Sequence, residues 1–194
     1  MEWGGGLYAV QSQLNMSVHP AGKTALELQG NAHYLPADFK QSNVVLFGAG
    51  NEKLPAWFKN HAWGVNVRYV MTDLFGRNRE LGLTTHNAGN YALKISSPER
   101  AALEFCYDVP IHGSFDELDQ IMSGLTTLRP RVVQELLEKC GSVKTKRLFL
   151  YLAEKHGHAW VGKLDLERVG LGTGKRALCK NGRYDDKYKL VVPK

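Results

Sequence analysis

The sequence predicts an α+β fold: a mixed α/β sheet flanked by helices, a helical middle segment and a C-terminal β-hairpin. Three observations predict it. Helix-like and strand-like runs alternate up to about residue 113, and helical patterns fill residues 114–157. Two β-like segments near the end then flank an Asn-Gly dipeptide, a strong hairpin signal. We expect residues 1–113 and 114–194 to be two parts of one domain.

Residues up to 72 alternate between helix-like and strand-like patterns. Apolar residues recur at helical spacing over 7–14 and 24–30, and the second pattern extends to Ala32. The run 43–48 is short, β-branched and ends in glycine, which favours a buried strand. The run 65–72 alternates apolar and polar side chains, which favours a half-buried strand.

A hairpin and a clearly marked helix start follow. Two β-like pieces flank the turn HNAGN, residues 86–90. The next helix could start in two ways. Either Ser96 and Glu99 form a capping box, or Ser97 caps the helix with Pro98 in its first turn. The inward-facing residues of this helix are predicted to be Ala102, Leu103 and Cys106.

The middle segment consists of predicted helices with explicit ends. Ser114 and Glu117 form a second candidate capping box, and Pro130 starts the next helix. Gly141 and Gly157 are predicted as the C-terminal caps of the last two helices.

The composition is that of a globular chain with a sizeable core. Of the 194 residues, 43% are hydrophobic and 23% are charged. No apolar run approaches the ~20 residues of a membrane span, and the N-terminus does not have the pattern of a signal peptide. Cys106, Cys140 and Cys179 are odd in number and far apart, which argues against a disulfide framework or a zinc ribbon. We therefore expect a cytoplasmic protein without cofactor or metal.

Positive charge is concentrated in the last third of the chain. Residues 1–128 contain 9 Lys/Arg and 12 Asp/Glu, whereas residues 129–194 contain 16 and 7, a net charge of +9. Such asymmetry indicates either an anionic partner or a solvated basic surface. The candidates for contact with DNA or another anion are Arg129, Arg131, Lys144, Lys146, Arg147, Lys175, Arg176, Lys180 and Arg183. Three of these, in the run KTKR, open a predicted helix, where cations oppose the helix dipole.

The run HPAGKTALELQG resembles the second half of a phosphate-binding loop. However, Ser17 stands where the first glycine of that loop is required, and Pro20 removes an amide that could bind phosphate. The preceding segment also has a helical pattern rather than that of the strand which the loop must leave. We therefore interpret Gly22 as a turn and Lys23 as a surface residue.

A second glycine-rich run, GLGTGKR at residues 170–176, also resembles a nucleotide loop. Val169 stands where the first glycine is required, and Arg176 replaces the Ser or Thr. The run precedes a hairpin rather than a helix. A flexible basic loop is the better interpretation, and it could contact phosphate through its amides, Lys175 and Arg176.

Two weaker patterns bear on metal chemistry. His156 and His158 lie just past a predicted helix, and without nearby acids or thiols they indicate a surface helix end rather than a metal site. Asp165, with Asp185 or Asp186 and Lys187, could imitate the acid and acid-x-Lys of a metal-dependent nuclease. No sheet that would carry Asp165 is evident.

Long segments resemble the AbiEi-family antitoxins of type IV toxin–antitoxin systems, also described as transcriptional regulators of abortive phage infection. The segments are GGLYAVQSQLNMSVHPAGKTALELQGNAHYLP, LPAWFKNHAWG, ISSPERAALE, GLTTLRP and SVKTKRLFLYLAEKHGHAW. They occur in order over nearly all of the chain.

The resemblance implies a two-part, non-enzymatic protein. An N-terminal winged helix-turn-helix would read the promoter, and a C-terminal domain would oppose a nucleotidyltransferase-like toxin without a stable complex being required. We expect this chain to start where the winged helix ends, so that only the antitoxin role carries over. Two alternatives stay open: a stand-alone basic DNA-binding module and a metal-dependent nuclease. No membrane partner is expected.

Overall fold

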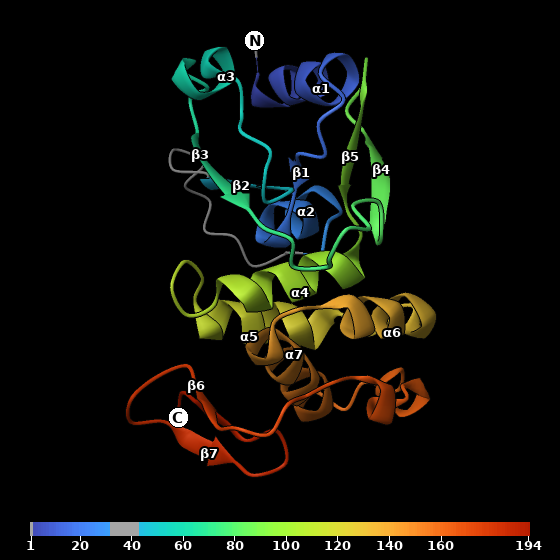
Figure 1. The fold of residues 1–194 in the computed structure, drawn as a ribbon, viewed down its shortest axis with the longest axis vertical. Coiled ribbons are helices and arrows are strands. Elements are labelled where there is room, and N and C mark those ends of the chain that lie inside the picture. Colours follow the sequence, from blue (N-terminus) through green and yellow to red (C-terminus); the bar gives the residue numbers. More distant parts are fainter. Residues whose placement is uncertain (1, 32–42) are drawn as a thin grey trace.

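The computed structural model describes residues 2–31 and 43–194, which form an α+β fold, as the sequence predicts (Figure 1). The α-helices are α1 (Trp3–Gln13), α2 (Gly22–Leu28), α3 (Ala56–Asn60), α4 (Pro98–Asp108), α5 (Phe115–Gly124), α6 (Pro130–Lys139) and α7 (Val143–Lys155). Two short 3-10 helices are η2 (Val161–Lys163) and η3 (Leu166–Arg168). The strands are β1 (His19–Pro20), β2 (Asn43–Gly48), β3 (Asn66–Met71), β4 (Leu83–Asn87), β5 (Ala92–Ser96), β6 (Arg176–Ala177), β7 (Arg183–Asp185) and β8 (Leu190–Val192). Ala32, the end of the second predicted helical pattern, lies outside the described residues.

The first sheet has the order β1-β2-β3 and contains both predicted strands. β2 and β3 are parallel, in register from Asn43 opposite Asn66 to Gly48 opposite Met71. β2 is largely buried and β3 is half-buried, which confirms both predictions. The short β1 pairs with β2 in the antiparallel direction.

The predicted hairpin and the helix after it are both confirmed. β4 and β5 pair in the antiparallel direction on either side of the predicted turn. Of the two helix starts considered, the structure has Ser97 at the N-cap and Pro98 in the first turn. Ser96 cannot form the capping box, because it is the last residue of β5 and its Oγ donates to Glu104 at 2.6 Å.

Helix α4 lies between the two halves of the molecule (Figure 1). The sheets β1-β2-β3 and β4-β5 lie on one side of it with α1, α2 and α3, and the C-terminal sheet lies on the other side with α5, α6 and α7. It contacts α2 above and α5, α6 and α7 below. The predicted inward residues Ala102, Leu103 and Cys106 are fully buried. Most of the helical segment therefore shares one core with α2, α4 and the C-terminal strands, while a smaller core lies between α1, β2 and β5.

The predicted helix ends are confirmed with one exception. Ser114 Oγ accepts from the amide of Glu117 at the start of α5, and Gly157, with a φ of +65°, follows the C-cap of α7. The prediction that Gly141 caps α6 is wrong. Cys140 is the C-cap in an extended conformation, and the Gly141 amide donates to the Leu74 carbonyl at 2.8 Å.

The C-terminal strands form a sheet with the order β6-β8-β7. A hairpin is present, but it joins β7 to β8, and β6 pairs with β8 in the parallel direction. The predicted pairing across Asn181-Gly182 is therefore wrong. The reason is burial, since Leu190, Val191 and Val192 of β8 are apolar and buried and take the central place. A Cβ at Gly182 would lie 2.0 Å from the Val192 carbonyl oxygen, so this approach requires glycine.

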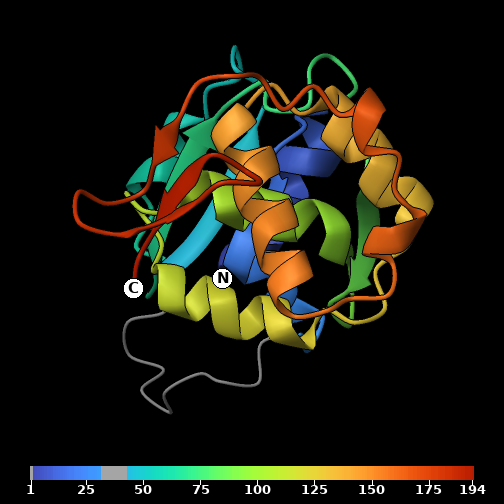
Figure 2. The ribbon, with the colours of Figure 1, turned by 90° about the horizontal axis from the view of Figure 1, so that it is seen from below.

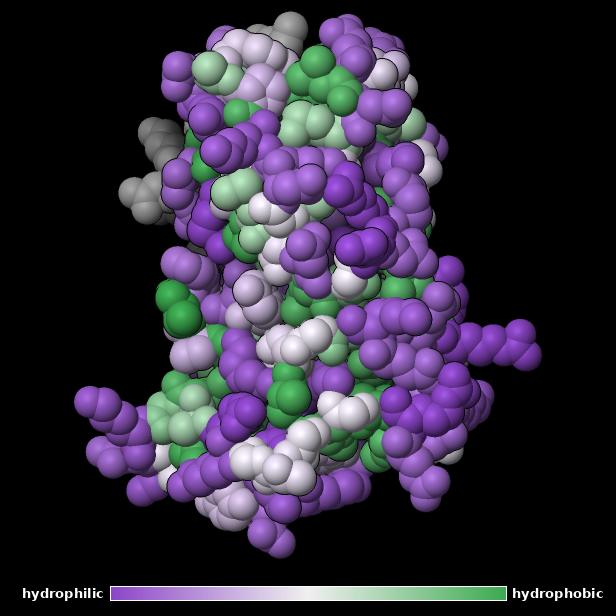
Figure 3. All heavy atoms as spheres, in the orientation of Figure 1, coloured by the Kyte–Doolittle hydropathy of each residue, from purple (hydrophilic) through white to green (hydrophobic). Residues whose placement is uncertain are grey.

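The surface is mixed, with hydrophilic residues over most of the face in Figure 3 and hydrophobic residues in small separate patches. Such patches are usual for a globular chain. None of the helices in the described ranges is long and apolar enough to cross a membrane.

Candidate nucleic-acid interface

Four of the predicted cations lie exposed on and beside the C-terminal sheet. We call Lys175, Arg176, Lys180 and Arg183 the C-terminal basic surface. Lys175 Nζ lies 5.3 Å from the centre of the Tyr184 ring, so the loop before β6 lies against β7. Among the residues that the structure describes, none of the four cations forms an ion pair with a carboxylate. Their charge is therefore available to an external anion.

Arg183 is the most constrained of the four. Its Nη2 donates to Tyr151 Oη on α7 at 2.6 Å, which fixes the side chain against the helical segment. The nearest acidic residue in sequence, Asp185, accepts instead from the Tyr188 amide at 2.8 Å. The turn between β7 and β8 therefore uses this carboxylate to hold its own backbone.

Arg129 and Arg131 lie at the start of α6, apart from the C-terminal sheet. Arg129 forms a two-pronged ion pair with Glu99, with Nε to Oε1 at 2.9 Å and Nη2 to Oε2 at 3.0 Å. Burial alone would raise the pKa of Glu99, but the bonds from Arg129 and Ser97 lower it to about 2. Arg131 is exposed and lines an open groove of about 920 Å³ with Lys163. Only Arg131 of this pair keeps a free charge among the described residues.

Lys144, Lys146 and Arg147 are not an exposed cluster, so the sequence interpretation of the run KTKR needs correction. Lys146 is 6% exposed and Arg147 is 2% exposed. The Nζ atom of Lys144 donates to the carbonyls of Tyr107 and Val109 at the end of α4. The cause is the position of α7, which packs against α4 and α5 and also against β8 (Figure 2). The helix is therefore buried around most of its circumference, which the run of cations at its start does not reveal.

Arg147 is held by the second glycine-rich run. We call residues 170–175 the glycine loop. The acceptors are the carbonyl oxygens of Leu171 at 2.8 Å from Nε, Gly174 at 2.5 Å from Nη1, Gly172 at 2.9 Å from Nη2 and Lys189 at 3.3 Å from Nη1. Burial, followed by the nearby Arg176, lowers the pKa of the Arg147 guanidinium. The inner side of the loop thus binds a cation rather than a nucleotide.

The first glycine-rich run is not a phosphate site, as the sequence analysis concluded. The amide of Gly22 donates to the Glu104 carboxylate at 3.1 Å, so an acid of the chain already occupies it. Lys23 forms ion pairs with Glu27 and Glu117. Its charge therefore serves the contact between α2 and α5.

The residues of the nuclease hypothesis are engaged separately. Asp165 accepts from the Glu167 amide at 3.1 Å, and Lys187 pairs with Glu154 at 2.6 Å. Within residues 2–31 and 43–194, no group of three or more His, Cys, Asp or Glu side chains could hold a metal ion.

The two histidines after α7 differ from each other. His156 Nε2 lies 2.8 Å from Asp119 Oδ1. His158 is buried, with Nε2 2.7 Å from the Met122 carbonyl and its ring stacked on Trp160. The expectation of a surface position is therefore wrong for His158, because Trp160 packs back onto the helical core.

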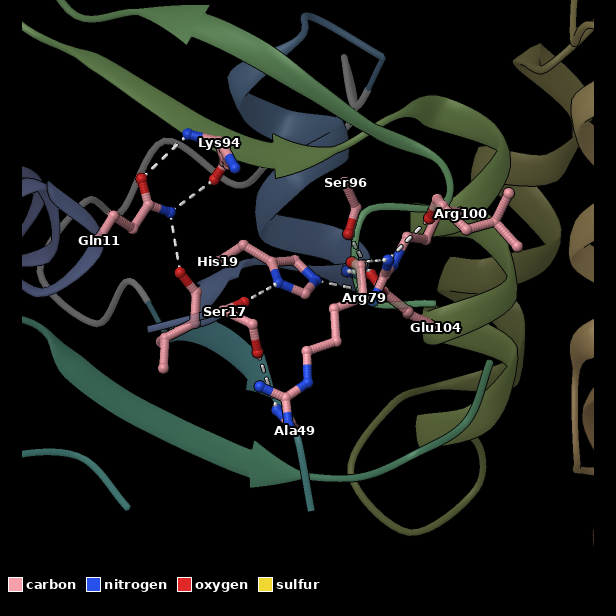
Figure 4. A network of polar contacts seen from close by, with 12 residues as sticks. Gln11, Ser17, His19, Ala49, Arg79, Lys94, Ser96, Arg100 and Glu104 are labelled. Atoms are coloured by element: carbon pink, nitrogen blue, oxygen red, sulfur yellow. Dashed lines mark hydrogen bonds and ion pairs between the residues drawn. The ribbon is translucent and has the colours of Figure 1, made fainter. Parts of the chain in front are cut away.

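One buried polar cluster is not predicted by the sequence patterns. Glu104, fully buried on α4, accepts from Arg100 Nε at 2.7 Å and from Ser96 Oγ at 2.6 Å. His19 Nε2 lies 3.3 Å from the same carboxylate, and His19 Nδ1 lies 2.7 Å from the Ser17 carbonyl (Figure 4). The spacing of Arg100 and Glu104, four residues apart on a helix, is the one signal present in the sequence.

The comparisons place these features in a known class. One family model, described as transcriptional regulator, AbiEi antitoxin, type IV TA system, matches residues 41–193, and another, described as transcriptional regulator, AbiEi antitoxin N-terminal domain, matches residues 1–37. The class of protein is thus that of the transcriptional regulators that act as antitoxins. The chain belongs to the AbiEi antitoxin family of type IV toxin–antitoxin systems, which confirms the resemblance. No curated protein matches the chain.

A solved structure shares the fold. The chain is similar to the crystal structure of the RV2827C protein from Mycobacterium tuberculosis, with a TM-score of 0.64 and 17% sequence identity over 95% of this chain. The chain spans 65% of the length of that protein. The division of this chain at residue 113 and the absence of the family's winged helix-turn-helix stay predictions.

Proposed function

We propose that the chain is a non-enzymatic antitoxin that opposes a nucleotidyltransferase-like toxin, and that its C-terminal basic surface contacts the phosphates of duplex DNA. The free thiols of Cys106 and Cys140, both buried, fit action in the reducing cytoplasm.

The DNA contact is supported chiefly by the distribution of ion pairs. Elsewhere many cations have a carboxylate partner, such as Arg100 with Glu104 and Arg129 with Glu99. The four cations of the C-terminal basic surface have none in the described part of the chain. Unpaired cations on one exposed face attract a polyanion and release its counterions on binding.

We expect the chain to bind duplex DNA weakly and with little sequence preference, with an affinity that falls as salt rises. If two to four phosphates are contacted, the slope of log Kobs against log salt should be about −2 to −4. Replacing Lys180→Gln together with Arg183→Gln should weaken binding and reduce the slope by about 2. Fluorescence anisotropy at several salt concentrations measures both the affinity for DNA and its salt slope.

The matched control is Lys53→Gln with Lys59→Gln, which removes the same charge from exposed sites elsewhere on the chain. Equal effects of the two double substitutions, or a flat salt response, would argue against the interface. Addition of Mg²⁺ should leave the DNA intact. Cleavage that is lost on Asp185→Asn would revive the nuclease alternative.

The antitoxin role is supported by the family match over residues 41–193. Co-expression with a nucleotidyltransferase-like toxin of such a system should restore the growth that the toxin arrests. The Lys180→Gln, Arg183→Gln variant should protect equally well, because we assign these residues to DNA rather than to the toxin. Continued arrest with both proteins soluble would count against the antitoxin role, and loss of protection only in the variant would tie it to the basic surface.

A further inference from the structure

The glycine loop has two chemically different sides. Its carbonyls at Leu171, Gly172 and Gly174 face inward and accept from Arg147. Four of its six residues are glycine or threonine, and the loop is exposed except at Leu171, which is half-buried. Within the described ranges, no acceptor takes a hydrogen bond from the backbone amides of residues 170–175. These amides therefore have no acceptor in the described part of the chain.

Two buried cations lie beneath this loop without a carboxylate. Among residues 2–31 and 43–194, Arg147 is neutralised only by carbonyl dipoles. Lys146 is 6% exposed and makes no hydrogen bond or ion pair with the described residues. Its Nζ atom lies 3.8 Å from the position that a Cβ would take on Gly170. Arg100, by contrast, is also buried but pairs with Glu104 at 2.7 Å.

Among the described residues, Tyr188 Oη is the only fully buried side-chain polar atom without a partner, so the Lys146 ammonium still reaches solvent although most of its side chain is covered. The Lys146 ammonium lies at the edge of the glycine loop. Lys175 and Arg176 extend the positive charge onto the surface, and Arg176 Nη1 lies 3.2 Å from the Cβ position of Gly174. Backbone amides without a protein acceptor and with cations beside them are the groups from which anion sites are built.

We propose that the glycine loop is a phosphate-binding site that takes one backbone phosphate of duplex DNA. In this site the loop amides donate to the phosphate oxygens, Lys175 and Arg176 flank them, and Lys146 supplies charge from beneath. A phosphate has several acceptor oxygens and suits such a set of donors better than a single carboxylate does. This proposal rests on the proposed DNA contact and makes it specific.

The surroundings favour a polymer over a small nucleotide. A shallow hollow of about 370 Å³ beside the loop is lined by Lys175, Ala177, Leu178, Cys179, Lys180 and Val191. It gives a nucleic-acid backbone a path from the glycine loop toward the rest of the C-terminal basic surface. A nucleotide would instead need a site that encloses its base.

The decisive variant is Lys146→Met, which keeps the length of the side chain and removes its charge. It should weaken duplex binding by roughly three- to tenfold and reduce the salt slope by about 1. Its thermal midpoint should stay close to that of the unchanged chain, because Lys146 makes no hydrogen bond or ion pair with the described residues. Unchanged affinity and salt slope in a folded Lys146→Met variant would overturn the proposal.

Amide chemical shifts locate the contact independently. Titration with a short DNA duplex should shift the amides of residues 170–175, and inorganic phosphate should shift the same amides at much higher concentration. Shifts confined to other residues would refute the loop site while leaving the DNA contact intact. No binding of the duplex by the unchanged chain would instead refute the DNA contact itself. Tighter binding of single-stranded RNA than of the duplex would reject DNA as the occupant.

Discussion

Replacing Glu104 by glutamine should lower the free energy of unfolding at pH 7 by about 3–5 kcal/mol, because it leaves a buried arginine without its counter-charge. Glu104 is fully buried and receives hydrogen bonds from Arg100, Ser96 and the amide of Gly22. The amide of glutamine can accept at only one of its two terminal atoms. It therefore cannot satisfy donors that approach both carboxylate oxygens.

Urea unfolding followed by tryptophan fluorescence measures this effect. The control is Glu80→Gln, which makes the same chemical change in the exposed ion pair between Glu80 and Lys94. That substitution should change stability by less than about 0.5 kcal/mol. A loss of similar size in both variants would mean that the Glu104 cluster does not stabilise the fold.

The same carboxylate makes stability depend on pH. Burial would raise the pKa of Glu104, but Arg100, His19 and Ser96 together lower it to about 2, below the ordinary value of 4.5. The stability that this group contributes is thus fully present above pH 4.5 and is lost as the pH falls toward 2. The difference in the free energy of unfolding between the unchanged chain and Glu104→Gln should therefore become smaller as the pH falls from 4.5 toward 2.

Much of the fold can be predicted from the sequence because its signals are local. The strands 43–48 and 65–72 follow from β-branched and alternating residues, and the start of α4 follows from Ser97 and Pro98. The order of the C-terminal strands is different. The Asn-Gly signal is local, but β6 pairs in parallel with β8 after the chain has passed through β7. Turn residues carry no information about such a non-local pairing.

The cations illustrate the same limit for the candidate site. Lys180 and Arg183 lie exposed as expected, because charged residues on a small edge strand, or in the turn that leads into it, are seldom covered. Lys146 and Arg147 differ because the glycine loop and β8, some 25 to 45 residues further on, return to cover α7. Net charge by itself could not separate the two groups.

The other large effect is expected at Arg147, where Arg147→Met should lower the free energy of unfolding by about 2–4 kcal/mol, since charge-assisted hydrogen bonds to four carbonyls are lost. Some of these carbonyls lie in the exposed glycine loop and can bind water instead, which keeps the loss below the sum of four such bonds. The Lys189 carbonyl also accepts from the Arg176 amide at 3.0 Å. The C-terminal sheet should therefore loosen together with the loop.

Hydrogen exchange distinguishes this local effect from a general one. The amides of Arg176 and Leu178, which bond β6 to β8, should exchange faster in Arg147→Met, while α4 keeps its protection. Arg131→Met, at an exposed site, should cost less than about 0.5 kcal/mol. The neighbouring Lys146→Met should not destabilise at all, because Lys146 has no partner to lose among the described residues. If Lys146→Met and Arg147→Met lowered the free energy of unfolding equally, Lys146 would have to be a structural residue like Arg147. If only Arg147→Met destabilises the fold and only Lys146→Met weakens DNA binding, then Arg147 holds the loop and Lys146 serves a ligand.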